Sequence, residues 1–587
     1  MLKLIKYLRK REIILIILSS IFVVLQVWLE LQLPDYMSRI TSLIQSENVK
    51  MIDVLSEGKM MLACAIGGLL TSIIVGFFAS HIGAGFSQSL RSKVFDKVYS
   101  FSMAEIKQFS VNSLITRTTN DISHVQRIIS MGLQVAVRAP IMAFWAVSKI
   151  LDKSQELSAL TAIAIVFIVI SISILMAMVI PKFKIMQALT DEINGVMREG
   201  LLGVRIIRAH NAEDYQEEKF ERTNTQITKI GKFTNRVMTV MWPIMDLITN
   251  ALTLAIYVVG AMLLVKTVGI DNRIELFSNV IVFSNYSMQV IASFMMMIMI
   301  FAMYPRVSVS ANRILEVLNT NTTVIEGNIA EENNKRGQIE FKNVYFKYPD
   351  GENYVLEDIS FIANKGETIA FIGATGCGKS TLINLIPRFY DVSKGEILID
   401  GINVKEYTKQ LLYSKLGYVP QKSILFSGTV NSNVAYGEKF GEKPNDESIK
   451  SAIKIAQGED FVLNMPEKYE SSIARGGNNI SGGQKQRLQI ARAIARHPEF
   501  YIFDDSFSAL DYRTDAILRK ELKKNIKEST NIIIAQRIGT IRYADKIVVL
   551  DNGKIVGFGE HNYLLDNCPT YRSIAESQLR KEELYNA

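Results

Sequence analysis

Six long apolar segments in the first half of the chain are the feature that most limits its fold. Each runs for about 20 residues or more, which is enough for an α-helix to cross ~30 Å of hydrocarbon. They lie at residues 12–34, 59–83, 131–150, 157–181, 242–266 and 275–304. We therefore predict an all-α membrane domain of six spanning helices over residues 1–319.

The charges beside these segments predict the orientation of the chain. Lys and Arg cluster at residues 3–11, before the first segment, and basic residues favour the cytoplasmic side. That segment is too long for a signal peptide and five more follow it, so we interpret it as an anchor. Six crossings then leave the N-terminus and the second half in the cytoplasm, and the lack of an organelle signal favours the plasma membrane. The short connections predicted outside are 35–58, 151–156 and 267–274, and the long charged ones predicted inside are 84–130 and 182–241.

The long inner connections have a helical pattern of apolar residues, for example Leu90, Val94 and Val98. At ~1.5 Å per residue, some 25 residues carry a helix about 35–40 Å further. We expect the spanning helices to continue as cytoplasmic extensions that turn around near 105–118 and 205–215.

Two bulk properties exclude other classes of protein. The net charge of +8 could suggest nucleic acid as a partner, but the basic residues gather beside apolar segments, so no nucleic acid is expected. Three cysteines, at positions 64, 377 and 568, cannot make a disulfide framework and lack metal-ligand spacing.

Ionisable residues inside apolar segments are costly and are candidates for function. We interpret Glu30 and Lys149 as interfacial residues whose side chains reach water. Arg138 and Asp246 lie deeper in their segments and are candidates to line a substrate cavity, with a helix-interface role as the alternative.

A methionine-rich run in the sixth segment adds Met295 and Met299 as cavity candidates, because methionine is common at adaptable binding surfaces. Core packing is the alternative explanation for this run. Such walls suit small amphipathic molecules or lipids as cargo, and peptides remain open.

The second half follows a polar linker at 320–337 and alternates short apolar strands with helical stretches, which predicts a parallel α/β domain over 338–575 and a tail at 576–587. One strand leads into a complete phosphate-binding loop before a helix. In that loop Lys379 is expected to reach the β- and γ-phosphates, and Ser380 to bind Mg²⁺. The loop consists of Gly373, Ala374, Thr375, Gly376, Cys377, Gly378, Lys379, Ser380 and Thr381.

Two further segments of this half predict nucleotide chemistry. An apolar strand ends in Asp504 and Asp505, and an acid at that edge can hold the magnesium shell, a role we give to Asp504. A second candidate anion site opens a helix at Ser481, Gly482, Gly483 and Gln484. Two phosphate sites, of which one has the lysine, suggest a nucleotide held between two chains.

Together these motifs make the chain resemble a half-transporter of the ATP-binding cassette (ABC) superfamily, of the exporter type. The resemblance covers nearly the whole chain. It implies a multidomain fold: a six-helix transmembrane domain with long cytoplasmic helical extensions, then an α/β P-loop nucleotide-binding domain. ATP and Mg²⁺ are the implied substrate and ion, and a second half-transporter and the lipid bilayer are the implied partners.

The resemblance also implies roles for single residues. Tyr348 matches the aromatic residue that stacks on adenine, and Gln421 the glutamine that senses the γ-phosphate and contacts Mg²⁺. Ser481 to Gln484 match the signature that binds the partner's ATP. Residues 199–201 and 208–210 resemble a coupling region. The loop that crosses the dimer interface is matched by Ser508, Ala509, Leu510 and Asp511.

The chain departs from the family pattern at two positions. The catalytic glutamate is replaced by Asp505, one methylene shorter, and the γ-phosphate histidine by Gln536, which cannot carry a proton. We predict a degenerate site that binds ATP and hydrolyses it slowly, as in heterodimeric bacterial multidrug exporters, which the chain resembles. The partner would supply the intact glutamate and histidine. A regulatory subunit that holds nucleotide as a structural staple, and a homodimeric exporter, are the alternatives; an importer is less favoured because importers of this family usually keep the two domains on separate chains.

Overall fold

The computed structural model describes residues 2–45, 50–151, 155–332, 335–580 and 583–585, and the chain forms two compact units. The first contains residues 1–96 and 115–319, and the second contains 97–114 and 320–587. Parts of the predicted connections at 35–58 and 151–156, of the linker and of the tail lie outside the described residues. Residues 97–114, which the sequence analysis assigned to the membrane domain, belong to the second unit.

Within the described residues, the first unit contains six helices long and apolar enough to span a membrane, as predicted. All of them extend beyond the apolar segments read from the sequence. The longest has 54 residues, about 80 Å at 1.5 Å per residue. The six helices are α1 (Lys10–Gln45), α2 (Met51–Ser100), α5 (Ile122–Leu151), α6 (Gln155–Leu202), α8 (Glu213–Lys266) and α9 (Ile270–Asn319), and α7 (Val204–Ala209) joins α6 to α8.

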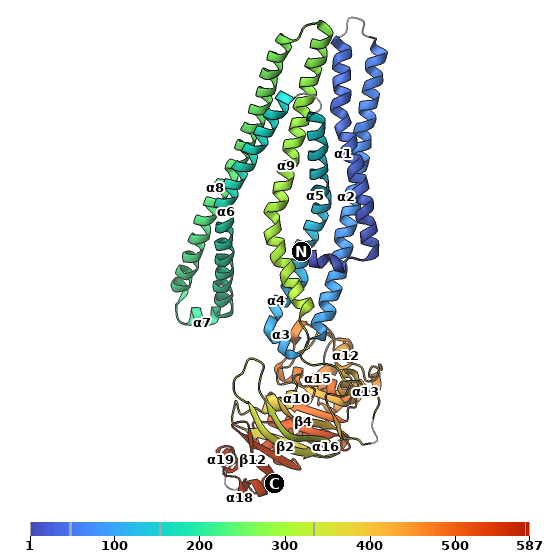
Figure 1. Cartoon of the computed structure of the whole chain (residues 1–587). Helices are drawn as coiled ribbons and strands as arrows, with labels where there is room; N and C mark the ends of the chain where they lie inside the picture. Colours follow the sequence, from blue (N-terminus) through green and yellow to red (C-terminus); the bar gives the residue numbers. More distant parts are fainter. Residues whose placement is uncertain (1, 46–49, 152–154, 333–334, 581–582, 586–587) are drawn as a thin grey trace. The chain divides into compact units, whose positions relative to one another are not determined.

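The buried cluster of this unit takes side chains from all six long helices, and α9 packs against α5 and α1 within it (Figure 1). Phe283 and Tyr286 of α9 are fully buried there, and the Tyr286 hydroxyl donates to the Leu31 carbonyl at 2.9 Å. Helices α6 and α8 run side by side and meet at the α7 turn (Figure 1). This turn, at Val204–Ala209, overlaps the predicted region 205–215.

In the part of the chain that the structure describes, the second unit has two large sheets and a short two-stranded sheet of β7 and β8. A six-stranded sheet has the order β12-β11-β3-β10-β9-β6, and a four-stranded antiparallel sheet has the order β2-β1-β4-β5. The strands are β1 (Ile339–Phe346), β2 (Leu356–Ala363), β3 (Thr368–Gly373), β4 (Lys394–Ile399), β5 (Ile402–Asn403), β6 (Leu416–Val419), β7 (Gly428–Thr429), β8 (Ser472–Ile473), β9 (Phe500–Asp504), β10 (Thr530–Ile534), β11 (Lys546–Asp551) and β12 (Lys554–Gly559). The helices are α3 (Met103–Phe109), α4 (Val111–Thr116, whose last two residues belong to the first unit), α10 (Lys379–Leu385), α11 (Lys409–Lys415), α12 (Val430–Val434), α13 (Asp446–Ile455), α14 (Glu459–Leu463), α15 (Gly482–Ala495), α16 (Tyr512–Asn525), α17 (Ile538–Ile541), α18 (His561–Asn567) and α19 (Pro569–Gln578).

Parallel pairing in the larger sheet brings distant segments to one edge. β10 lies between β3 and β9, and Ile534 of β10 is opposite both Phe371 and Asp504. β6 is the neighbour of β9 on its other side. Because the carboxyl ends of parallel strands share an edge, the segments after these four strands are neighbours.

A buried ion cluster stabilises this unit at some distance from that edge. Lys415 is buried with Asp400, and its Nζ donates to Asp400 at 2.9 Å and to Glu499 at 3.0 Å. A buried charge that keeps its partners is tolerated, whereas removing Lys415 would take the positive charge away from two carboxylates at high cost.

Helix α3 is held to the rest of the second unit by residues of its own first turn. Ser102 caps α3 in a capping box with Glu105, and Oε1 of Glu105 accepts a hydrogen bond from the Thr323 amide at 3.0 Å. Lys107 also pairs with Asp350 at 3.1 Å. These contacts explain why residues 97–114 group with the second unit.

Candidate functional site

The phosphate-binding loop follows β3 in the middle of the six-stranded sheet. Gly376 and Gly378 have φ angles of +87° and +101°, which glycine adopts without the strain of a side chain. Lys379 begins α10, and its Nζ donates to the carbonyl oxygens of Gly373 and Ala374 at 2.8 Å each. The nine predicted loop residues run from Gly373, the last residue of β3, through the turn to Thr381 in the first turn of α10. The loop therefore has the open backbone that a phosphate group requires.

Ser380 and Asp504 meet across the sheet edge. The Ser380 hydroxyl donates to Oδ1 of Asp504 at 3.3 Å, and burial raises the pKa of Asp504. A hydroxyl and a carboxylate are the oxygen ligands that Mg²⁺ prefers, with phosphate and water completing its shell. Among the described residues no cluster of three or more His, Cys, Asp or Glu could hold a metal ion. The pair fits a magnesium ion that depends on nucleotide phosphates for its other ligands.

Asp505 lies next to Gln536 and Gln421, as the strand order requires. Its Oδ2 accepts hydrogen bonds from Nε2 of Gln536 at 3.0 Å and from Nε2 of Gln421 at 3.4 Å. The backbone of Asp505 has φ +48°, an uncommon conformation for a residue with a side chain. Burial raises the pKa of Asp505. The two residues that depart from the family pattern are therefore bonded to each other.

Tyr348 is fixed beside the loop. Its hydroxyl lies 3.0 Å from Oγ1 of Thr381, and its ring meets the edges of Phe346 and Tyr390 at centroid distances of 5.0 and 5.3 Å. The Lys107 ammonium lies 5.3 Å from the ring centroid. This placement suits an aromatic platform for a base whose phosphates occupy the loop.

The segment predicted to be the signature, Ser481 to Gln484, lies at the N-terminus of α15 with Ser481 as its N-cap. The Ser481 hydroxyl accepts from the Gln484 amide at 3.3 Å, and Oε1 of Gln484 accepts from the Ser481 amide at 2.9 Å, which completes a capping box. Ser481 and Gly482 are exposed, and Gly483 and Gln484 are partly buried. An exposed helix start of this kind can bind phosphate from another chain.

The predicted interface loop lies between β9 and α16. Ser508 donates to the Asp505 carbonyl at 2.9 Å, and Asp511 caps α16 by accepting from the Thr514 amide at 2.9 Å. Ala509 is exposed and Leu510 is buried. The loop is therefore bonded to Asp505, the residue that directly follows β9.

Gln578, at the end of α19, was not found from the sequence. Its Nε2 donates to the Gln536 carbonyl and its Oε1 accepts from the Ile538 amide, both at 2.8 Å. It thereby fixes the backbone of the loop that carries Gln536. No motif marks it, because it bonds to backbone groups 42 and 40 residues away.

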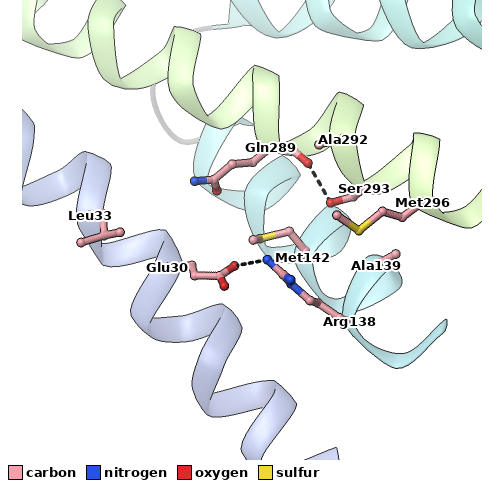
Figure 2. A pocket seen from close by; sticks show the side chains of 9 residues that line it. All are labelled: Glu30, Leu33, Arg138, Ala139, Met142, Gln289, Ala292, Ser293 and Met296. Atoms are coloured by element: carbon pink, nitrogen blue, oxygen red, sulfur yellow. Dashed lines mark hydrogen bonds and ion pairs between the residues drawn. The ribbon is translucent and has the colours of Figure 1, made fainter. Parts of the chain in front are cut away.

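The membrane candidates do not form one group. Arg138 lines a cavity between α1, α5 and α9 (Figure 2), together with Met296 rather than the predicted Met295 or Met299. Asp246 and Met299 are exposed, and neither lines that cavity. The mean hydropathy of a segment predicts that it spans the membrane. It does not predict on which face of the helix a residue lies.

The interfacial interpretation of two charges missed their pairing. Glu30 lines the same cavity and accepts from Nη2 of Arg138 at 2.7 Å, and Lys149 donates to Asp35 at 2.8 Å. Each of these ion pairs joins α1 to α5 across more than a hundred residues, a distance over which the sequence gives no pairing signal.

Comparison with known proteins agrees with this geometry. The profile described as ABC transporter transmembrane region matches residues 16–294, and the profile described as ABC transporter matches residues 356–508. An uncharacterized ABC transporter ATP-binding protein of Mycobacterium tuberculosis is 38% identical over 525 residues, covering 88% of this chain and 87% of its own length. The ABC transporter ATP-binding protein YfiB of Bacillus subtilis, also uncharacterized, is 33% identical over 529 residues, covering 89% of this chain and 90% of its own.

A solved structure of a bacterial Atm1-family ABC exporter with ATP bound has the same fold. Its TM-score is 0.82 at 22% identity, with 97% of this chain and 100% of that chain covered. Six spanning helices, a complete phosphate loop and these relatives lead to one conclusion: the chain belongs to the ABC transporter family and is an exporter-type transport ATPase with its transmembrane and ATP-binding domains in one chain.

Proposed function

We propose that this chain is one half of a heterodimeric exporter at the plasma membrane, whose own ATP site binds nucleotide but hydrolyses it slowly. The observation that carries the proposal is the bond between Asp505 and Gln536. These two side chains occupy the positions from which a glutamate and a histidine act on the γ-phosphate in the family pattern.

The chemistry of the pair supports slow hydrolysis. The carboxylate of Asp505 ends one methylene short of a glutamate, and a misplacement of about 1 Å can cost about 10²-fold in rate. Gln536 donates one hydrogen bond to Asp505, and an amide cannot supply the charge of a protonated imidazole. We expect binding to persist, because Lys379, Ser380 and Asp504, the residues proposed to hold phosphate and Mg²⁺, match the family pattern.

The fast site would form with the partner. Ser481 to Gln484 keep the family signature and an exposed helix start, so they can complete a site to which the partner contributes loop, glutamate and histidine. Exporters of this fold act as dimers, so a second chain is required in any case.

The α7 turn supports docking onto that second chain. In the part of the chain that the structure describes, none of the α7 side chains is buried. Leu201, Leu202 and Ile206 are all exposed at this turn, which a second cassette would cover. We place this turn, the cassette and the N-terminus in the cytoplasm, as the basic residues at the start of the chain favour.

The test compares binding with turnover in the purified chain, reconstituted in lipid nanodiscs. We expect Mg²⁺-dependent binding of a fluorescent ATP analogue, displaced by ATP, together with a hydrolysis rate close to that of Lys379→Ala. That variant should lose binding as well. If the unmodified chain hydrolyses ATP rapidly by itself, it works as a homodimer and the asymmetric proposal is wrong.

A further inference from the structure

A small cavity in the first unit has a polar floor and apolar walls. It has a volume of about 290 Å³ and lies between α1, α5 and α9. Figure 2 shows Glu30 facing Arg138, with Gln289 on the opposite helix and methionine side chains beside them. Leu33, Met142 and Met296 supply apolar surface. Its lining comes from one unit only.

The two charged side chains of this cavity, Glu30 and Arg138, differ in how many of their hydrogen-bonding groups have a partner. Oε2 of Glu30 accepts from Arg138 at 2.7 Å, and its Oε1 accepts from Nε2 of Gln26 at 2.9 Å. The guanidinium has five N–H donors. Among the described residues it makes only the bond to Glu30, and its side chain is 30% exposed. The carboxylate is thus occupied at both oxygens, while most guanidinium donors are left for another acceptor.

Gln289 adds an acceptor without a donor. Its Oε1 is buried, and within the described parts of the chain no donor reaches it. A buried polar atom of this kind is costly unless something bonds to it. One turn further, the Ser293 hydroxyl donates a hydrogen bond to the backbone carbonyl of Gln289 at 2.7 Å. This bond does not satisfy Oε1 of the Gln289 side chain.

We propose that this cavity binds the head group of an amphipathic oxyanion, with the acid on Arg138 and a hydroxyl or amide N–H of the same molecule on Oε1 of Gln289. Planar guanidinium forks match carboxylate and phosphate oxygens in two parallel bonds. The hydrocarbon part contacts Leu33, Met142 and Met296, since methionine adapts to irregular apolar shapes. A cationic amphipath is disfavoured, because the charge of Glu30 is already paired with Arg138, and a second cation would lie beside that guanidinium. The inference rests on the proposed export function, for which this molecule is the cargo class.

The test measures binding without ATP in nanodiscs of phosphatidylcholine. Four photoreactive twelve-carbon probes are compared: an N-acyl glycine, an alkyl phosphate, the methyl ester of the first, and an alkyl trimethylammonium. We expect the two oxyanions to label peptides of α5 and α9 in competition with unlabelled compound, and the ester and the cation to label them at least 10-fold less. The ratio of the first two probes tells a carboxylate cargo from a phosphate one.

Two variants with opposite expected effects separate binding from folding. Arg138→Gln should weaken oxyanion binding at least 10-fold, whereas Glu30→Gln should strengthen it several-fold by releasing the guanidinium. A purely structural ion pair would make both variants weaker. Lys149→Gln, which breaks another ion pair between α1 and α5 outside the cavity, is the matched control and should stay within 2-fold of the unmodified chain.

The outcomes also separate this inference from the export proposal. Binding that depends on Arg138 without ATP-dependent efflux by the paired chains would leave the site standing as a lipid site and remove its role as cargo site. Equal labelling of Arg138→Gln and the unmodified chain, or stronger labelling by the cation, would overturn the inference and leave the ATP chemistry untouched.

Discussion

Restoring the glutamate and the histidine should convert the slow site into a fast one. Asp505→Glu moves the carboxylate outward by about 1.5 Å, the length of one carbon–carbon bond. Gln536→His removes the amide that now donates to Asp505 at 3.0 Å and supplies an imidazole that can be protonated. Because misplacement by about 1 Å can cost about 10²-fold, the double variant should hydrolyse ATP about 10²-fold faster, equivalent to about 2.7 kcal/mol of barrier.

The assay is single-turnover hydrolysis of labelled ATP with protein in excess, in the presence of Mg²⁺. A second copy of the chain can complete the site through its own Ser481 segment, so no partner is needed for this measurement. Because the two positions are in contact, the rate effects of the two single variants should not be additive. Each single variant should recover only part of the gain in rate. Asp446→Glu, the same exchange at an exposed position on α13, should change nothing, and Lys379→Ala should abolish the gain.

Two results would refute this reasoning. One is a double variant no faster than the unmodified chain although both bind ATP equally, since geometry would then not limit the rate. The other is an unmodified chain that already turns over as fast as the double variant.

Three further effects follow from contacts in the second unit. Lys415→Ala should destabilise the cassette by about 3–5 kcal/mol, because two carboxylates lose their buried partner; denaturant unfolding of the chain checks this, and an unchanged midpoint contradicts it. Burial raises the pKa of Glu105, but hydrogen bonds from the Ser102 cap and Thr323 outweigh it and keep the value below normal. Its stabilisation is therefore present above the ordinary glutamate pKa of about 4.3 and lost as pH falls through the lowered value, so hydrogen exchange in α3 should accelerate at acid pH, and Glu105→Gln should show the same acceleration already at pH 7. Gln578→Ala frees the loop of Gln536, so ATP affinity should fall while ADP affinity stays unchanged; equal loss for both nucleotides would mean a general defect.

Much of the nucleotide site could be predicted because its residues belong to short local motifs. A strand, a glycine turn and a helix start carry the phosphate loop, and a second strand carries Asp504. Their convergence follows from parallel pairing, which fixes the edge at which those strands end. Asp505 and Gln536 could be recognised as departures from the family pattern for the same reason, because each directly follows or lies close to the end of such a strand.

The remaining features depend on side-chain contacts between distant segments. The Glu30–Arg138 pair joins positions 108 residues apart, and Gln578 bonds to backbone atoms that any residue could offer. Asp246 is exposed on α8, which could not be predicted because hydropathy does not specify the helix face on which a residue lies. The assignment of residues 97–114 to the second unit depends on Glu105 and Lys107, whose partners lie more than 200 residues away.

Helix α3 has a consequence for how the cassette can be cut out of the chain. The second unit is not one continuous stretch, because residues 97–114 reach it from an earlier part of the polypeptide. A fragment that starts at residue 320 lacks the Glu105 bond to Thr323 and the Lys107 pair with Asp350, and it bares the surface beside Tyr348 that Ala104 helps to line. Nucleotide affinities measured on such a fragment would describe an incomplete domain. Chimaeras between relatives should therefore exchange the short helix and the cassette together.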